Sequence, residues 1–268
     1  MHLLYYNPSF VLSLSHKNHI ITEKSINVKI LGIILLSILA AILLFILFLW
    51  IVSLPIDKTK SYDKDSKFYR GLLYFCTSLA MFFLRVKINV TGAEQIPKSS
   101  YLFVGNHRSN FDPLIAWHIF EESNLAFISK PDNFDVPIFG KYVKRCCFMG
   151  IDRSSPRQSM TVINAAADLI RCGEVSVGVY PEGTRSFDGK LLPFHNGVLK
   201  TAIKAKCPIV VVGMEGTEKI HENTPFRRSV VDVKVIKVIN PDGRTTQELG
   251  DMVKDCLKPY DKSVSAKA

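Results

Sequence analysis

Hydrophobic and polar positions divide the chain into an apolar N-terminal part and a longer part in which short apolar runs alternate with polar ones. From residue 30 to residue 54 the sequence contains no charged side chain. At about 1.5 Å of rise per residue, a helix over this stretch is about 37 Å long and covers a hydrocarbon core of about 30 Å. A soluble core helix rarely continues this far without a polar face, and no signal-peptide cleavage site precedes Pro55. The pattern predicts a retained helix that crosses or enters a membrane.

A second apolar stretch covers residues 71–84, between Arg70 and Arg85. It is too short to span a membrane comfortably, which favours an interfacial or re-entrant helix. A helix that packs against the rest of the domain fits the pattern equally well. Basic residues are more frequent between the two apolar stretches than just before the first one, at Lys58, Lys60, Lys64, Lys67 and Arg70. Because basic loops tend to remain in the cytoplasm, the main domain is expected on the cytoplasmic face of the membrane.

Beyond Arg85, runs rich in branched and aromatic residues alternate with helical patterns. The predicted strands cover residues 86–90, 101–105, 125–129, 147–151, 175–180, 209–213 and 231–238. The predicted helices cover residues 113–121, 156–172, 198–206 and 245–257. This alternation predicts an α/β fold, with a mixed, largely parallel sheet flanked by helices and preceded by the membrane helix and the second short apolar helix. The expected organisation is a tail at 1–27, a membrane helix at 28–54, a basic linker with an interfacial helix at 55–85 and a catalytic domain at 86–268.

Composition and charge narrow the classes of function. Hydrophobic residues make up 47% of the chain and charged residues 22%, which is typical of a protein with a packed core. The net charge of +10 favours an anionic partner, which could be nucleic acid, an anionic membrane lipid or a phosphorylated substrate. The membrane segment and the lack of a zinc or RNA-binding motif argue against nucleic acid. The six cysteines follow no metal-ligand spacing, so neither a metal site nor a disulfide framework is expected.

A first chemical motif follows the predicted strand 101–105, where His107 precedes Asp112 by five positions. A carboxylate can bond one imidazole nitrogen and leave the other to take a proton from a substrate hydroxyl. The pattern also fits a simpler structure, in which Asp112 caps a helix that starts at Pro113 and His107 is a surface residue.

A second motif follows the predicted strand 175–180 and reads Pro181-Glu182-Gly183-Thr184-Arg185-Ser186. Glycine lets the backbone approach a ligand closely, and the forked guanidinium suits phosphate oxygens. Glu182 is expected to hold the guanidinium of Arg185. Taken alone, the motif also fits a surface turn with a weak ion pair.

In this order and at this separation, the two motifs resemble blocks of the glycerolipid acyltransferase family, which includes the 1-acylglycerol-3-phosphate acyltransferases. The resemblance implies transfer of a fatty acyl group from an acyl thioester, carried by acyl carrier protein or coenzyme A, to the sn-2 hydroxyl of lysophosphatidic acid. It implies that His107, paired with Asp112, acts as the base, without a covalent acyl-enzyme, a metal or another cofactor. It further implies that Glu182, Gly183, Thr184 and Arg185 contribute to substrate binding.

Two further blocks fit the same resemblance. Lys130, followed by Pro137 and Gly140, resembles a family block in which a basic residue precedes a helix, and the resemblance places Lys130 in substrate binding. Arg153, which ends the run Gly150-Ile151-Asp152-Arg153, is implied to join Arg185 on the acceptor phosphate. The chain departs from the family at His195, where relatives often carry lysine, and at Asp132, which is shifted from the usual acidic position.

Other functions remain as alternatives from the sequence. The same chemistry suits glycerol 3-phosphate, a lysophospholipid with a larger head group or an aminoacyl lipid as acceptor. A non-catalytic module that binds anionic membrane lipid would also explain the apolar segments and the positive charge.

Overall fold

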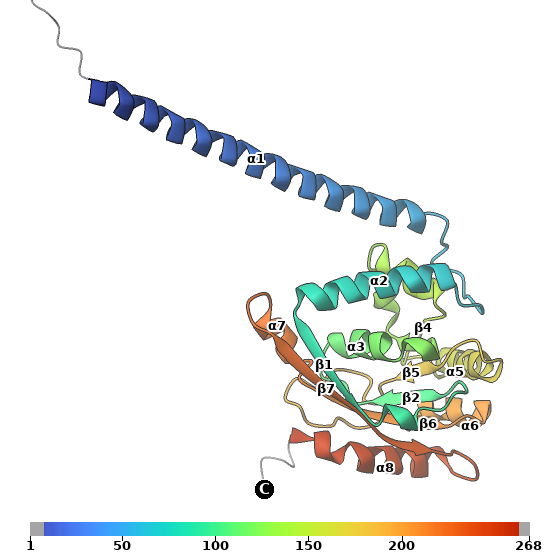
Figure 1. Cartoon of the computed structure of the whole chain (residues 1–268). Helices are drawn as coiled ribbons and strands as arrows, with labels where there is room; N and C mark the ends of the chain where they lie inside the picture. The colour runs from blue at the N-terminus through green and yellow to red at the C-terminus, as the bar shows by residue number, and fades with distance from the viewer. Residues whose placement is uncertain (1–7, 263–268) are drawn as a thin grey trace, which may run out of the picture. The chain divides into compact units, whose positions relative to one another are not determined.

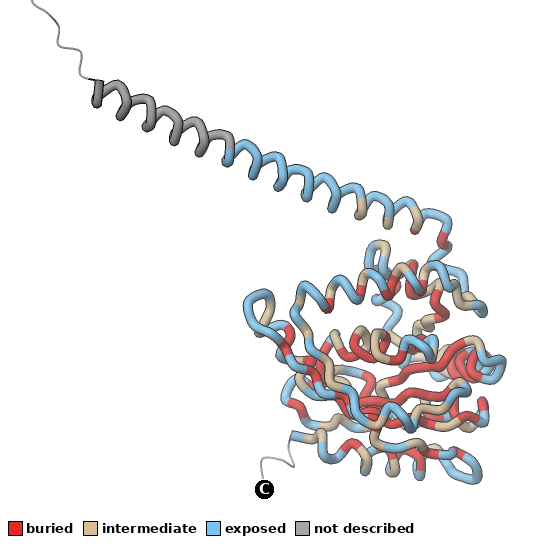
Figure 2. The backbone as a smooth tube through the Cα atoms, viewed as in Figure 1, coloured by how far each residue is buried: buried red, intermediate tan, exposed pale blue. Residues whose placement is uncertain are grey.

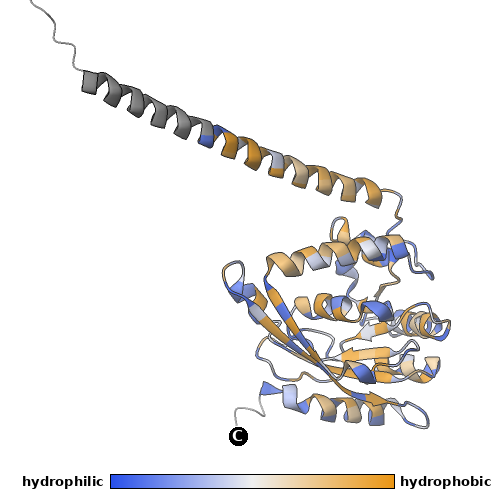
Figure 3. Cartoon of the chain, in the orientation of Figure 1, coloured by the Kyte–Doolittle hydropathy of each residue, from blue (hydrophilic) through white to orange (hydrophobic). Residues whose placement is uncertain are grey.

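The computed structural model describes residues 8–262, and the side chains of residues 27–262. It divides into two compact units, Met1–Pro55 and Ile56–Ala268. In the first unit, helix α1 (Pro8–Ser53) includes the segment Asn27–Ser53, which is long and apolar enough to cross a membrane (Figure 3). The described helix reaches back to Pro8, so it extends well into the region that the sequence suggested as a tail.

The second unit is built on a seven-stranded sheet with the order β1-β7-β6-β2-β5-β3-β4 (Figure 1). Strands β2 to β6 all run in the same direction, whereas β7 is antiparallel to β6, and the edge strand β1 is parallel to β7. The mixed, largely parallel sheet is therefore confirmed. The strands are β1 (Val86–Thr91), β2 (Leu102–Gly105), β3 (Ala126–Ser129), β4 (Met149–Gly150), β5 (Val177–Val179), β6 (Ile209–Glu215) and β7 (Ser229–Ile239).

Helices cover both faces of this sheet (Figure 1). Apolar residues of α5, α6 and α8 pack on one face, and the other face carries α3 under α2 and α4. The helices of this unit are α2 (Lys67–Phe83), α3 (Phe111–Ile119), α4 (Phe139–Arg145), α5 (Pro156–Arg171), α6 (Lys200–Ala205), α7 (Lys219–Asn223) and α8 (Thr246–Leu257). Short 3-10 turns are η1 (Ala93–Gln95), η2 (Glu121–Ser123), η3 (Pro131–Phe134), η4 (Asn196–Leu199) and η5 (Lys258–Tyr260).

Alternation along the strands explains how the two faces differ. Leu102 and Val104 belong to the aliphatic core beneath α5, α6 and α8, whereas Phe103 between them stacks edge to face with Phe127 and Tyr180. A Cβ atom at Gly178 would lie 2.3 Å from the ring of Phe127, so glycine makes room for this aromatic layer. The core residues form continuous buried runs through the central strands β2, β5 and β6, whereas β7 alternates between buried and exposed residues (Figure 2).

Helix α2 has two different faces. Leu73, Tyr74 and Met81 are buried, so the helix packs on its own domain, as one of the two sequence interpretations expected. Its other face exposes large apolar side chains, namely Phe68, Phe75, Leu79, Phe82 and Phe83.

Arg70 changes the charge argument for orientation. Its guanidinium is buried, donates to Asp65 and to the Leu125 carbonyl oxygen, and lies over the Trp117 ring. Because Arg70 is neutralised in a buried ion pair with Asp65, it adds little to the positive charge on which the predicted membrane orientation depends.

Candidate active site

The two motifs meet at the carboxyl-terminal edge of the parallel strands. Strand β2 ends at Gly105, just before His107, and its neighbour β5 ends at Val179, just before Glu182. Parallel neighbours end at the same edge of a sheet, which is where α/β proteins bind ligands. The β2–β5 pairing therefore brings together side chains that are far apart in the sequence.

His107 and Asp112 form the expected pair. Nδ1 of His107 lies 2.9 Å from Oδ2 of Asp112, whose carboxylate is fully buried. The same oxygen accepts the backbone N–H groups of Arg108 at 2.6 Å and Ser109 at 2.7 Å. The hydroxyl of Thr217 donates to the other oxygen, Oδ1.

These contacts exclude the simpler interpretation of Asp112 as a helix cap. The N-cap of α3 is Asn110, and the Asp112 carboxylate closes the loop that leads back to His107. Because four hydrogen-bond donors surround the carboxylate, its position is fixed, and it in turn fixes the orientation of the imidazole. In the described part of the chain no hydrogen bond occupies Nε2, so that nitrogen is available to a substrate hydroxyl.

Tyr180 supports the imidazole from one side. The two rings are stacked, with centroids 4.4 Å apart and planes 18° apart. Phe127 continues the stack behind Tyr180, with centroids 5.6 Å apart and planes 2° apart. Burial, together with the charge of Asp112, raises the pKa of the Tyr180 hydroxyl well above its ordinary value, so the side chain stays neutral.

Glu182 joins the two loops of the site. Its Oε1 accepts the backbone N–H of His107 at 2.8 Å, and its Oε2 accepts that of Leu192 at 3.0 Å. Burial raises the pKa of this carboxyl, and these two hydrogen bonds oppose the rise. The expectation that Glu182 holds Arg185 is therefore wrong, because both carboxylate oxygens are used by backbone donors.

Gly183 and Arg153 lie close to the histidine loop. Gly183 has a φ of 74°, and a Cβ atom there would lie 2.8 Å from a guanidinium nitrogen of Arg153 and 3.0 Å from the His195 ring. Arg153 donates to the Gly183 carbonyl oxygen.

The loop that carries Arg185 is bonded to the histidine loop, because the Ser186 N–H donates to the His107 carbonyl oxygen at 2.8 Å. The guanidinium of Arg185 lies 5.1 Å from the centroid of the Phe187 ring.

The remaining predicted site residues are placed less directly. Thr184 is exposed beside Arg185. Lys130 is exposed just after β3, next to β4, and among the described residues no hydrogen bond or ion pair joins its side chain to the histidine loop. The structure thus brings His107, Asp112, Glu182, Gly183 and Arg153 together, with Arg185 on the loop that bonds the histidine loop through Ser186, and leaves Lys130 at the margin.

Two residues of the site were missed by the sequence argument. Tyr180 directly precedes the second motif, so an aromatic residue at the end of a predicted strand was the available signal. Thr217 follows β6, whose end lies at the same edge as β2. No local pattern marks it, because its contact with Asp112 joins positions 105 residues apart.

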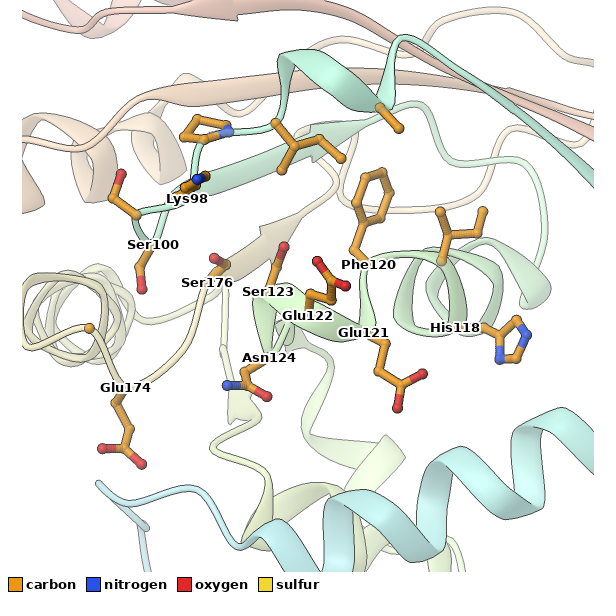
Figure 4. A pocket seen from close by; sticks show the side chains of 16 residues that line it. Lys98, Ser100, His118, Phe120, Glu121, Glu122, Ser123, Asn124, Glu174 and Ser176 are labelled. Atoms are coloured by element: carbon orange, nitrogen blue, oxygen red, sulfur yellow. The ribbon is translucent and has the colours of Figure 1, made fainter.

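A cavity lies elsewhere in the domain. It has a volume of about 780 Å³ and is lined by Ser100, Asn124 and Ser176, which precede β2, β3 and β5 (Figure 4). It therefore opens at the amino-terminal edge of the sheet, opposite the catalytic pair. Its charged lining is mainly acidic, with Glu121, Glu122 and Glu174 beside Lys98, which does not suit a phosphorylated acceptor.

Comparison with known proteins decides the family. The sequence profile of the family described as Acyltransferase matches residues 87–215. The probable 1-acyl-sn-glycerol-3-phosphate acyltransferase of Mycoplasma genitalium is 31% identical over 194 residues, which cover 68% of this chain and 71% of the relative. The chain belongs to this acyltransferase family.

Other relatives agree with this assignment. The 1-acyl-sn-glycerol-3-phosphate acyltransferase of Limnanthes douglasii is 28% identical over 190 residues, covering 70% of this chain and 67% of the relative. The crystal structure of the LPA acyltransferase PlsC from Thermotoga maritima superposes with a TM-score of 0.60 at 25% identity, over 74% of this chain and 80% of that one. The protein is thus an O-acyltransferase, which excludes the non-catalytic alternative. The acyltransferase profile spans every predicted site residue and ends two positions before Thr217.

Proposed function

We propose that this acyltransferase moves a fatty acyl group from an acyl thioester to the sn-2 hydroxyl of 1-acylglycerol 3-phosphate, giving phosphatidic acid. The observation that carries the proposal is the His107–Asp112 pair, joined through Glu182 and Ser186 to the loop that bears Arg185. The names of the relatives support the same acceptor.

The reaction needs one base and no covalent intermediate on the enzyme. Nε2 of His107 takes the proton of the acceptor hydroxyl, and the oxygen attacks the thioester carbonyl carbon. When the tetrahedral intermediate collapses, the carbon–sulfur bond breaks and the leaving thiolate takes the proton back from the imidazolium. Asp112 stabilises the imidazolium through Nδ1. A positioned base of this kind contributes about 10² to 10⁴ in rate, so orientation of both substrates supplies the remainder.

The acceptor phosphate is assigned to Arg153 and Arg185. Both are near Gly183, whose lack of a side chain lets a ligand approach the backbone. A guanidinium offers two parallel donors to phosphate oxygens, which a lysine ammonium cannot do. Thr184 and Lys130 are proposed as outer contacts of the substrates. The mechanism uses no metal or cofactor, since the base activates the hydroxyl and the thioester is already reactive.

The proposed setting is a membrane with the catalytic domain on its cytoplasmic face. The segment Asn27–Ser53 supports the anchorage, and exposed Lys58, Lys60, Lys64 and Lys67 support the orientation. The acceptor is then itself a membrane lipid, and the acyl donor, on acyl carrier protein or coenzyme A, arrives from the cytoplasm.

A turnover assay with the full chain in lipid nanodiscs tests the proposal. Acyl-coenzyme A and acyl-carrier protein are each combined with lysophosphatidic acid, glycerol 3-phosphate, lysophosphatidylcholine and lysophosphatidylglycerol. The expected result is phosphatidic acid formation that is lost in the His107→Ala protein. Faster turnover of another acceptor, or undiminished activity of His107→Ala, would contradict the proposed substrate or the proposed base, respectively.

A further inference from the structure

Exposed aromatic and basic side chains from two distant parts of the sequence meet at one corner of the catalytic domain. Phe82 and Phe83, at the end of α2, are 75% and 67% exposed. Phe226, between α7 and β7, is 85% exposed, and Arg227 and Arg228 beside it are also exposed. We name the loop of residues 224–228 the Phe226 loop; Figure 2 shows it on the surface beyond α7.

Hydrogen bonds from the Arg85 side chain and from the backbone hold the Phe226 loop against the end of α2. Arg85, which follows α2, donates through its guanidinium to the Phe226 carbonyl oxygen at 3.0 Å. The Ser229 N–H donates to the Arg85 carbonyl oxygen at 3.3 Å, and Val86 pairs with Ser229 at the start of the β1–β7 ladder. Within the loop, Arg227 N–H donates to the Asn223 carbonyl oxygen at 2.7 Å. The loop therefore has a defined place beside Phe82 and Phe83.

This corner lies on the same edge of the sheet as the catalytic pair. The loop follows β6 and α7, and Thr217, between those two elements, bonds Asp112. His221 of α7 packs on Phe111, the residue before Asp112, with ring centroids 4.8 Å apart. Whatever binds the Phe226 loop is thus held at the edge of the sheet that carries the catalytic pair.

We propose that the Phe226 loop and the end of α2 form a membrane-contact site that binds the surface of a bilayer containing anionic lipids. Exposed phenylalanine rings are typical of segments that insert an apolar face at the boundary between lipid head groups and acyl chains. Arg85, Arg227 and Arg228 complement anionic head groups, and each basic residue near such a surface adds about fivefold to binding. The acidic groups nearby are Glu222 on α7 and Asp232 on β7, and Asp232 accepts a hydrogen bond from Asn89.

This contact is additional to the membrane segment of α1. A single membrane helix does not by itself set the orientation of the domain that follows it. A second contact at the active-site edge selects the orientation in which His107 faces the lipid. The inference rests on membrane attachment, and not on which acceptor or donor the enzyme uses.

Tryptophan quenching in nanodiscs tests the contact directly. The chain has two tryptophans, Trp50 and Trp117, so the signal of a Phe226→Trp variant is read as the difference from the unmodified protein. Phospholipids brominated on their acyl chains are expected to quench the added tryptophan when anionic lipid is present. The matched control is Lys254→Trp, on the exposed side of α8 across the sheet from α2, which should not be quenched (Figure 1).

Charge removal then tests the lipid preference. In the Phe226→Trp background, Arg227→Gln with Arg228→Gln should weaken the contact about 25-fold, and about 1 M salt should weaken it as well. The control is Lys254→Gln, which should leave the quenching unchanged. If Phe226→Trp does not fold, Phe83→Trp reports on the same corner.

The outcomes separate this inference from its alternatives. Quenching equal to that of the Lys254→Trp control overturns it. A blue-shifted emission that brominated lipid does not quench indicates a protein partner, such as a second copy of the chain, and also overturns it. Because quenching needs no turnover, a failure of the acyl-transfer proposal leaves this test intact.

Discussion

Replacing Asp112 with asparagine removes the negative charge beside His107 while conserving the size of the side chain. The carboxylate accepts three donors on Oδ2, from His107, Arg108 and Ser109, and one donor on Oδ1, from Thr217. An asparagine that places its carbonyl oxygen at the Oδ2 position keeps the first three hydrogen bonds. Its NH₂ group then faces the Thr217 oxygen, which can rotate to accept. The imidazole should keep its orientation and lose only the partner charge.

The expected loss follows from the geometry. Nδ1 and Oδ2 are 2.9 Å apart, which places the two charge centres about 4 Å apart when the imidazole is protonated. At an effective dielectric constant of about 20, opposite charges at this separation attract by about 4 kcal/mol. Each 1.36 kcal/mol is tenfold in rate, so full transfer of the proton would cost about 10³-fold. Because proton transfer is incomplete in the transition state, kcat should fall about 10²- to 10³-fold.

Steady-state kinetics with lysophosphatidic acid in nanodiscs measure this effect. The KM for the acceptor should stay close to that of the unmodified protein, since Asp112 lies behind the histidine and not on the substrate. His107→Ala gives the floor of the assay, and a thermal melt shows whether Asp112→Asn is folded. A folded Asp112→Asn protein with an unchanged kcat and a raised KM would refute the role given to the carboxylate.

Four further changes probe the rest of the site. His107→Ala should abolish turnover, while a pull-down on lysophosphatidic-acid vesicles should still retain the protein. If His107→Ala keeps turnover at the rate of Asp112→Asn, another group is the base. Arg185→Ala should mainly raise the KM for the acceptor, and Arg185→Lys should restore only part of the affinity, because a point charge does not replace a forked donor. If Arg185→Ala and His107→Ala change kcat and KM to the same extent, the separate roles of the two residues are contradicted. Thr217→Val should lower kcat about 10- to 100-fold, since a hydrogen bond to a charged group contributes about 1.5 to 3 kcal/mol, and Thr217→Ser should restore it. Tyr180→Leu should lower kcat while Tyr180→Phe keeps it, which distinguishes ring stacking on His107 from a role of the buried hydroxyl; equal losses in the two variants would assign the effect to the hydroxyl.

Much of the architecture was predictable from the sequence because it depends on local pattern. All seven predicted strands are present, since runs of branched and aromatic residues bounded by polar turns favour extended structure wherever they fold. The predicted helices at 156–172 and 245–257 agree with α5 and α8 within one residue at each end. Their caps are encoded locally, because Ser155 and Thr245 each accept a backbone N–H of the first turn.

Shorter elements were less predictable. Helix α4 (Phe139–Arg145) was implied only by the family resemblance, and α7 (Lys219–Asn223) was not expected at all. The expected helix at 198–206 is divided between η4 and α6. One or two turns carry too few apolar positions to establish a period, so contacts with the sheet decide their form.

The sequence by itself determined the apolar segment and the α/β pattern, because each depends on residues that are near one another along the chain. It left two interpretations of the motif at His107 and Asp112, and the structure decided for the hydrogen-bonded pair. Only the tertiary structure decided that Glu182 binds the backbone of the histidine loop and not the side chain of Arg185. It also decided that Thr217 and Tyr180 support the His107–Asp112 pair, and that the Phe226 loop meets the end of α2. The contacts of Glu182, Thr217 and Tyr180 arise because parallel strands separated in the sequence end at one edge of the sheet, and the contact of the Phe226 loop arises because β1 and β7 begin side by side. The order in which strands lie side by side depends on how the whole chain packs, and no local pattern specifies it.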